Sequence, residues 1–298
     1  MTPAPHLLCL GLGYTAGRLA RAAMARGWRV TGTSRTARDA ATLETDGIRG
    51  LVFDREHPLP GEALEDVTHV LVSVPPDDQG DPVLEMFGEA LAAAPGLRWV
   101  GYLSTTGVYG DAGGAWVDET SPTRPTQARS RRRAEAEAGW LALHRDHGVP
   151  VEIFRLAGIY GPGRSAIDSV RAGTAHRVVK PGHVTCRIHV DDIARALAAA
   201  MEAPAPGTVF NLADDEPAPP QDVVAEACAL LGVAPPPEVP LEAADISPMA
   251  RSFYADTRRV SAARIKARLG LRWRHPTYRE GLRAILAEEG DAPRATGA

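Results

Sequence analysis

Two glycines near the start of the chain have the spacing of a phosphate-binding turn. Gly11 and Gly13 follow a short apolar run, and Ala16 stands just before a helical sequence. In a strand, turn and helix of this kind, the first glycine permits the tight turn and the second lets a pyrophosphate approach the backbone. The small side chain of Ala16 lets helix and strand pack, and free N–H groups at the helix start attract anions. The pattern predicts a dinucleotide site at Gly11, Gly13, Tyr14 and Thr15.

The end of the second expected strand indicates which dinucleotide binds. NAD sites usually end this strand in a carboxylate that accepts from the ribose 2′-hydroxyl, whereas a 2′-phosphate needs a cation and hydroxyl donors. The sequence places Thr33, Ser34 and Arg35 here, with no carboxylate before Asp39. An arginine can bind phosphate through two parallel hydrogen bonds. We therefore expect NADP rather than NAD; the alternative is that Arg35 is a solvated loop residue.

Short apolar runs alternate with longer helical patterns in the first half of the chain, which is typical of parallel β-α-β units. The expected strands are His6–Leu10, Arg29–Thr33, Gly50–Phe53, His69–Val74, Arg98–Leu103 and Val151–Leu156. The expected helices are Thr15–Arg26, Ala37–Thr45, Pro82–Ala94 and Arg131–His144. Right-handed connections then give an α/β fold with a doubly wound parallel sheet of the Rossmann type.

The composition of the sequence changes after Tyr160. Proline- and glycine-rich segments such as GPGRS, EPAPP and APPPEVP follow, with further helical stretches between them. We expect residues 1–160 to form the NADP-binding Rossmann domain and residues 161–298 to form mainly a smaller substrate-binding lobe. A strand near 208–212 is expected to return from this lobe to the sheet.

The composition excludes several classes of function. The 298 residues carry a formal net charge of -4, a balance that does not attract nucleic acid. Cys9, Cys186 and Cys228 are widely spaced and form no metal-binding pattern, so neither a disulfide framework nor a metal site is expected. No apolar stretch approaches the roughly 20 residues of a membrane helix. We expect a cytoplasmic protein with a small-molecule substrate, without membrane partners, and either a monomer or a homodimer.

Several longer motifs resemble those of one enzyme family. They are STTGVYG at 104–110, DETSP at 118–122, FRLAGIYGPG at 154–163, RIHVDDI at 187–193 and FNL at 210–212. Together with the glycine turn they cover nearly the whole chain. They resemble the extended short-chain dehydrogenase/reductases, and within them the atypical NAD-dependent epimerase/dehydratase-like proteins. The resemblance implies a Rossmann fold, a pyridine nucleotide cofactor and oxidoreductase or epimerase chemistry.

The resemblance also implies roles for single residues. Asp54 would lie beside the adenine, and Val74 and Pro75 would pass along the cofactor. Thr105 matches the serine or threonine that hydrogen-bonds the reacting oxygen, and Tyr109 is a second catalytic candidate in the same motif. The expected cofactor-binding residues are thus Gly11, Gly13, Tyr14, Thr15, Ser34, Arg35, Asp54, Val74 and Pro75.

The general acid/base of this family, a tyrosine four residues before a lysine, is missing. Glu135 resembles the glutamate that follows the pair, and counting back from it puts the lysine position at Arg131 and the tyrosine position at Gln127. The only lysines are Lys180 and Lys266, and neither follows a tyrosine at this spacing. A phenol becomes a useful base near neutrality when an adjacent ammonium lowers its pKa, and glutamine cannot replace it.

Three explanations of this gap remain open. Another group supplies the proton, the candidates being Tyr109, Tyr160, His183, Lys180 and Asp111. Alternatively, solvent is the proton source, or the protein binds NADP without turnover.

Arg164, Lys180 and Arg187 could lie around an anionic substrate such as a sugar nucleotide.

Two hypotheses for the function follow. The first is an NADP-dependent oxidoreductase or epimerase acting on a small hydroxyl or carbonyl compound. The second is a catalytically silent NADP-binding regulatory or sensor protein.

Overall fold

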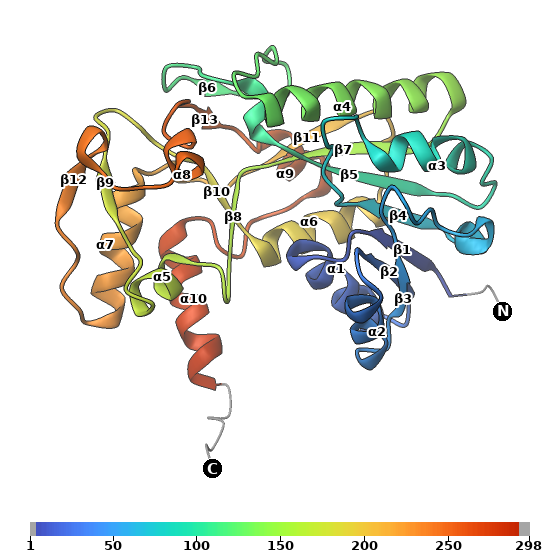
Figure 1. The fold of residues 1–298 in the computed structure, drawn as a ribbon, viewed down its shortest axis with the longest axis horizontal. Helices are drawn as coiled ribbons and strands as arrows, with labels where there is room; N and C mark the ends of the chain where they lie inside the picture. The colour runs from blue at the N-terminus through green and yellow to red at the C-terminus, as the bar shows by residue number, and fades with distance from the viewer. Residues whose placement is uncertain (1–3, 292–298) are drawn as a thin grey trace.

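A seven-stranded parallel sheet is the centre of this computed structural model, which describes residues 4–291 (Figure 1). In spatial order the strands are β11 (Val209–Leu212), β7 (Val151–Leu156), β5 (Trp99–Thr105), β4 (His69–Val72), β1 (His6–Leu10), β2 (Arg29–Ser34) and β3 (Arg49–Val52). The chain proceeds outward from β1 to β3, and then in the opposite direction from β4 to β11. Open α/β sheets bind ligands at such a reversal, outside the carboxyl ends of the strands.

Helices cover both faces of the sheet. On one face lie α1 (Tyr14–Met24) and α6 (Val190–Glu202); on the other lie α3 (Pro82–Ala92) and α4 (Ala128–His147) (Figure 1). The helix α2 (Ala37–Thr45) packs against β2 and β3 at the sheet edge. Successive side chains of β1 alternate between the two cores, as the pleat of a doubly covered strand requires. The Rossmann-type α/β fold expected from the sequence is confirmed.

A second group of elements has its own apolar core, which includes Tyr160, Ile167, Val223 and Tyr278. The helices α5 (Ala166–Arg171), α7 (Pro220–Leu231) and α10 (Tyr278–Asp291) contribute to this core. Of the remaining helices, α8 (Pro248–Ser252) has no buried residue, and α9 (Ala263–Leu269) packs through Ile265 in the core of the central sheet. Short parallel pairs join β8 (Gly158–Tyr160) to β10 (Arg187–His189), β9 (Arg177–Val179) to β12 (Glu238–Pro240), and β6 (Trp116–Val117) to β13 (Arg259–Val260). Single 3-10 turns are η1 (Gly61–Leu64), η2 (Thr106–Tyr109) and η3 (Leu241–Ala243).

The chain crosses between the two groups more than once. The expected returning segment forms β11, which pairs in parallel with β7 along its whole length. The division of the chain into a cofactor domain and a substrate lobe at residue 160 stays a prediction. Within residues 4–291, no helix combines the length and apolarity needed to cross a membrane.

Candidate functional site

The glycine turn joins β1 to α1 at the point where the strand order reverses. Gly11 has a φ of 86°, and a Cβ there would lie 3.1 Å from the amide nitrogen of Val74, so only glycine fits without strain. Gly13 is the N-cap of α1 and has open space where a side chain would begin. No side chain caps this helix, and its first turn contains no acidic residue. Its free N–H groups and positive dipole end suit a phosphate.

A cavity of about 820 Å³ extends from this turn to the ends of β2 and β3. Its lining includes Gly11, Gly13, Ser34, Arg35, Asp54, Val74 and Pro75, all of which the sequence assigns to the cofactor.

The two arginines that line this cavity differ in whether they are paired with a carboxylate. Arg55 is paired with Asp77 at 2.6 Å and with Glu85 at 2.7 Å. Arg35 is exposed, and it forms no ion pair with any residue of the described chain. The charge of Arg35 is therefore available to an anionic ligand, although the carboxylate of Asp39 lines the same cavity.

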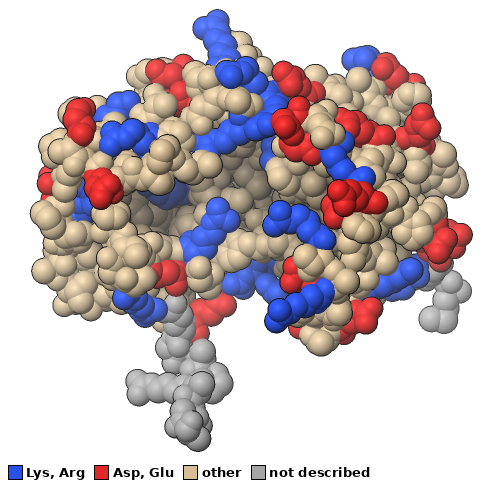
Figure 2. Space-filling view, in the orientation of Figure 1, with Lys and Arg blue, Asp and Glu red and all other residues tan. Residues whose placement is uncertain are grey.

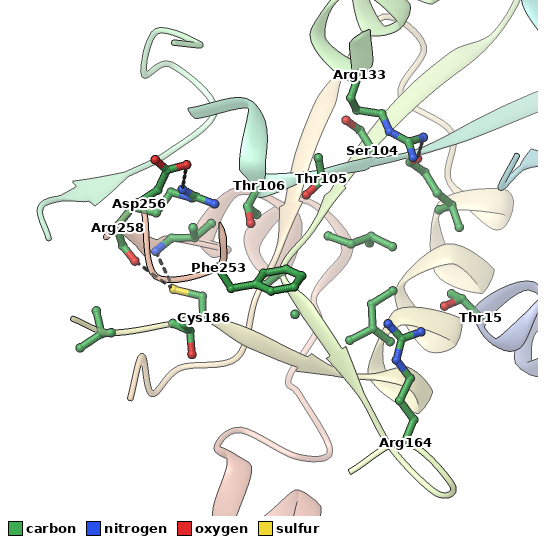
Figure 3. Close-up of a pocket in the computed structure, with 18 of the residues that line it drawn as sticks. Thr15, Ser104, Thr105, Thr106, Arg133, Arg164, Cys186, Phe253, Asp256 and Arg258 are labelled. Atoms are coloured by element: carbon green, nitrogen blue, oxygen red, sulfur yellow. Dashed lines mark hydrogen bonds and ion pairs between the residues drawn. The ribbon is translucent and has the colours of Figure 1, made fainter. Parts of the chain in front are cut away.

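A second pocket, of about 380 Å³, meets this cavity at Ser73, which lines both. Thr105, the last residue of β5, lies in its wall, together with Thr15 of α1 (Figure 3). The Thr105 hydroxyl accepts a hydrogen bond from the Gly107 amide at 3.0 Å, and its own proton remains available as a donor. The space-filling view shows a central hollow with basic side chains around it (Figure 2).

The buried glutamate of α4 is Glu137 and not Glu135. Glu135 is exposed, whereas Glu137 is buried and binds Arg155 with Oε2 and Nη2 2.7 Å apart. Counting back from Glu137 with the same spacing puts the lysine position at Arg133 and the tyrosine position at Arg129. Arg131 is exposed and donates to the carbonyl of Thr126.

Arg133 and Arg129 are oriented differently. Arg133 donates to the carbonyl oxygen of Leu103 at 2.8 Å and lines the Thr105 pocket (Figure 3). Arg129 instead donates to Ser252 of α8 at 3.1 Å, and its guanidinium lies 4.7 Å from the ring centre of Phe253. Arg129 thus contacts the segment that carries Phe253, and Phe253 itself lines the pocket.

Tyr109 does not reach the pocket, contrary to its place among the catalytic candidates. It is 3% exposed, its hydroxyl donates to Oδ1 of Asn211 at 2.7 Å, and it accepts from Arg155 at 2.9 Å. Burial raises the pKa of the Tyr109 phenol. Both hydrogen-bonding directions of this hydroxyl are in use, so Tyr109 belongs to the buried network around Glu137 and Ser104.

The other proton donors suggested by the sequence also lie outside the residues that line the Thr105 pocket. Lys180 donates to the Tyr254 carbonyl at 2.6 Å, and Asp111 accepts from the Thr257 amide at 2.8 Å. His183 is buried beside Thr257, and burial lowers its pKa to about 4. Tyr160 is buried, and its hydroxyl donates to the Thr277 carbonyl at 3.3 Å.

Asp256 is a pocket residue that the sequence reasoning missed. Of the described residues lining this pocket and a smaller cavity of about 240 Å³ beside it, Asp256 has the only carboxylate. Its side chain is 8% exposed and lies 3.5 Å from Arg258, and Thr126 donates to it at 2.9 Å (Figure 3). The smaller cavity lies between Thr105 and the first turn of α4. No local pattern marks Asp256, because it comes from a distant segment.

The three basic residues assigned to the substrate are not all together. Arg187 lines a third cavity, of about 550 Å³, and Arg164 lines both this cavity and the Thr105 pocket. Lys180 lines neither, although its partner Tyr254 lines the third cavity.

A histidine caps the start of α6. His189 is the N-cap and accepts from the Asp191 amide, whereas Asp192 accepts from the amides of Arg274 and His275. Ligand atoms of His189, Asp191 and His275 lie within 4.8 Å of one another. We assign no metal to them, because Arg18 lies 3.6 Å from Asp191 and the capping bond occupies Nδ1 of His189.

Comparisons with known proteins show the family of the chain. The model of the NAD dependent epimerase/dehydratase family matches residues 83–213. The chain is 32% identical to Protein YeeZ of Escherichia coli K12 over 241 residues, which is 76% of this chain and 84% of YeeZ.

Two solved structures show the same fold. One is a functionally unknown conserved protein from Silicibacter pomeroyi, with 50% identity, a TM-score of 0.89 and coverage of 96% of this chain and 99% of that one. The other is the dTDP-glucose 4,6-dehydratase of Bacillus anthracis in complex with NAD, with a TM-score of 0.77, 18% identity and 97% of each chain covered. The chain therefore belongs to the NAD dependent epimerase/dehydratase family.

Proposed function

We propose that the protein is an NADP-dependent oxidoreductase, or an epimerase-like enzyme, that acts on a small hydroxyl or carbonyl compound. The observation that carries this proposal is the meeting of two cavities at Ser73. One contains Arg35 beside the glycine turn, and the other contains Thr105. A dinucleotide that followed both would have its 2′-phosphate near Arg35 and its nicotinamide near Thr105.

The residues present fit this cofactor. The uncapped start of α1 suits the pyrophosphate, Asp54 lies where the adenine would be, and Arg35 offers an unpaired charge to the 2′-phosphate. When bound, NADP would supply or accept the hydride. Thr105 would orient the reacting oxygen with its hydroxyl, and Arg133 would donate to the nucleotide ribose or to that oxygen.

We assign the proton transfer to Asp256. A guanidinium keeps its proton in proteins and cannot act as a base, so Arg129 and Arg133 cannot perform the role of the missing tyrosine. Asp256 shares both adjoining cavities with Thr105 and is largely shielded from solvent. A carboxyl group in this place can exchange a proton with the reacting oxygen directly or through the Thr105 hydroxyl.

An anionic group on the substrate would suit the third cavity, where Arg187 lies. An activated sugar belongs to this class of anionic substrates. The structurally similar dehydratase of Bacillus anthracis is named for one such compound, dTDP-glucose. Membership of this family favours an oxidoreductase over the silent regulatory protein considered from the sequence.

The test is to mix purified protein with NADPH and a panel of aldehydes, ketones and nucleotide-linked keto-sugars, and to follow the nicotinamide absorbance. We expect turnover of at least one compound. Tight NADPH binding without turnover across the panel would support the silent alternative instead.

A further inference from the structure

A turn of the second group of elements packs directly on the start of α1. The Tyr14 hydroxyl donates to the carbonyl oxygen of Pro162 at 3.0 Å. A Cβ on Gly161 would lie 2.5 Å from that hydroxyl and 2.6 Å from a methyl group of Val190, so only a glycine allows this approach. Gly161 and Arg164 exchange two backbone hydrogen bonds, of 3.0 and 3.1 Å, which close the turn. The turn 161–164 is therefore fixed against the phosphate-binding corner.

Arg164 projects from this turn toward the same corner. Its guanidinium carbon lies 5.9 Å from the ring centre of Tyr14, and its side chain lines the pocket that also contains Thr15 (Figure 3). The residue is exposed, and it makes no ion pair within residues 4–291. Arg18, one turn further along α1, is by contrast 3.6 Å from both Asp191 and Glu288. Arg164 thus retains an uncompensated positive charge beside the start of α1.

A cofactor pyrophosphate at the start of α1 would carry two negative charges. The free N–H groups of the helix approach it from one side only. A guanidinium on the opposite side would add charge-assisted hydrogen bonds, which are stronger than neutral ones.

We infer that Arg164 binds the pyrophosphate of the cofactor, and does so from the substrate side of the cleft. This rests on the proposed cofactor binding and reassigns Arg164, which the sequence places with the substrate. Since Arg164 also lines the third cavity, the bound cofactor would fix one wall of the substrate site.

The test compares two arginine variants with three ligands. NADPH, NADH and adenosine 2′,5′-bisphosphate are titrated by calorimetry into the wild-type protein, R164Q and R35A. The bisphosphate has the 2′-phosphate but only a single 5′-phosphate in place of the pyrophosphate. For R164Q we expect about tenfold weaker binding of both dinucleotides and a smaller loss of binding for the bisphosphate. For R35A we expect weaker NADPH and bisphosphate binding, and unchanged NADH binding.

These outcomes separate the inference from the proposed function. Wild-type dinucleotide affinity in R164Q overturns the inference, and so does a loss confined to NADPH and the bisphosphate. Equal affinity of the wild-type protein for NADH and NADPH overturns only the NADP preference. No binding of either dinucleotide to the wild-type protein overturns both.

Two further variants show whether the effect is local. R272Q changes an exposed arginine outside the cavities and should bind all three ligands as the wild type does. Y14F removes the hydrogen bond to Pro162 and so releases the turn that holds Arg164. It should therefore weaken the binding of NADPH and of NADH by similar factors. If the losses of binding free energy in Y14F and R164Q simply add in the double variant, this anchoring is contradicted, because the effects of residues that act together are not additive.

Discussion

Glu137 of α4 and Arg155 of β7 form an ion pair in which both side chains are almost fully buried, at 5% and 8% exposure. Glu137 also accepts a hydrogen bond from Ser104, the neighbour of Thr105. The pair therefore fixes the rotation of α4 relative to the strand that ends in the pocket. This rotation directs Arg133 toward the pocket.

Removing one partner of this pair should strongly destabilise the protein. R155M leaves the Glu137 carboxylate buried without a counter-charge, and breaking a buried pair in this way costs about 3–5 kcal/mol. We expect a loss of this size in urea unfolding, and a smaller loss for the double variant E137Q/R155M than for the sum of the single variants. Single variants within about 1 kcal/mol of the wild type would show that the pair contributes little.

Asp39 should weaken NADPH binding. Its carboxylate lines the same cavity as Arg35 and would repel a 2′-phosphate. We expect D39N to bind NADPH a few-fold more tightly, on the order of 1 kcal/mol or less, with NADH binding unchanged. Fluorescence titration of the bound nicotinamide measures both. Weaker binding of NADH to D39N would instead place the ribose 2′-hydroxyl, rather than a phosphate, beside Asp39.

The Thr105 hydroxyl should be required for turnover and not for cofactor binding. T105V removes the donor to the reacting oxygen, and a loss of about 100-fold in kcat is expected for a lost transition-state contact. T105S keeps the hydroxyl and should restore most of the activity. Because Thr105 also accepts from Gly107, thermal unfolding of both variants must accompany the kinetics. Equal activity of T105V and T105S would remove Thr105 from the mechanism.

Asp256 should be required for turnover. D256N cannot exchange a proton, and we expect about 100-fold slower steady-state turnover. D245N changes an exposed aspartate outside the pocket and is the matched control. Turnover of D256N at the wild-type rate would point to solvent as the proton source.

Asp214 should make the fold less stable as the pH rises. It is 2% exposed, and burial raises its pKa to about 8. Between about pH 4 and pH 8 the folded state therefore holds this proton more tightly than the unfolded state, so the stability that it contributes is lost as the pH rises through this range.

The D214N variant tests this expectation. Its amide cannot ionise, so it should gain stability over the wild type near pH 8 and lose that advantage toward pH 4. Urea unfolding at several pH values measures the difference. A difference between D214N and the wild type that does not change with pH would refute the assignment.

Much of the sheet could be predicted because its signals are local. β1, β7 and α2 have the bounds expected from the apolar runs and turn residues, since buried parallel strands and short capped helices are marked by their own residues. The position of the cavity around Arg35 could also be predicted from local sequence signals. The glycine turn and the end of the next strand meet at one edge of a parallel sheet.

The catalytic pocket could not be predicted in the same way. The run RSRRRAEAE repeats arginine and glutamate at several offsets, so the sequence alone does not say which glutamate is buried. Only the contact with Arg155, on another element, selects Glu137 over Glu135. Asp256 and Phe253 reach the pocket from a segment about which no family motif or local periodicity gives information.

Arg133 contributes a planar guanidinium to the Thr105 pocket. Amine-directed reagents, such as aldehydes that form Schiff bases, find no target among the described side chains of this pocket. A carboxylate or phosphate group can instead be matched by two parallel hydrogen bonds from a guanidinium.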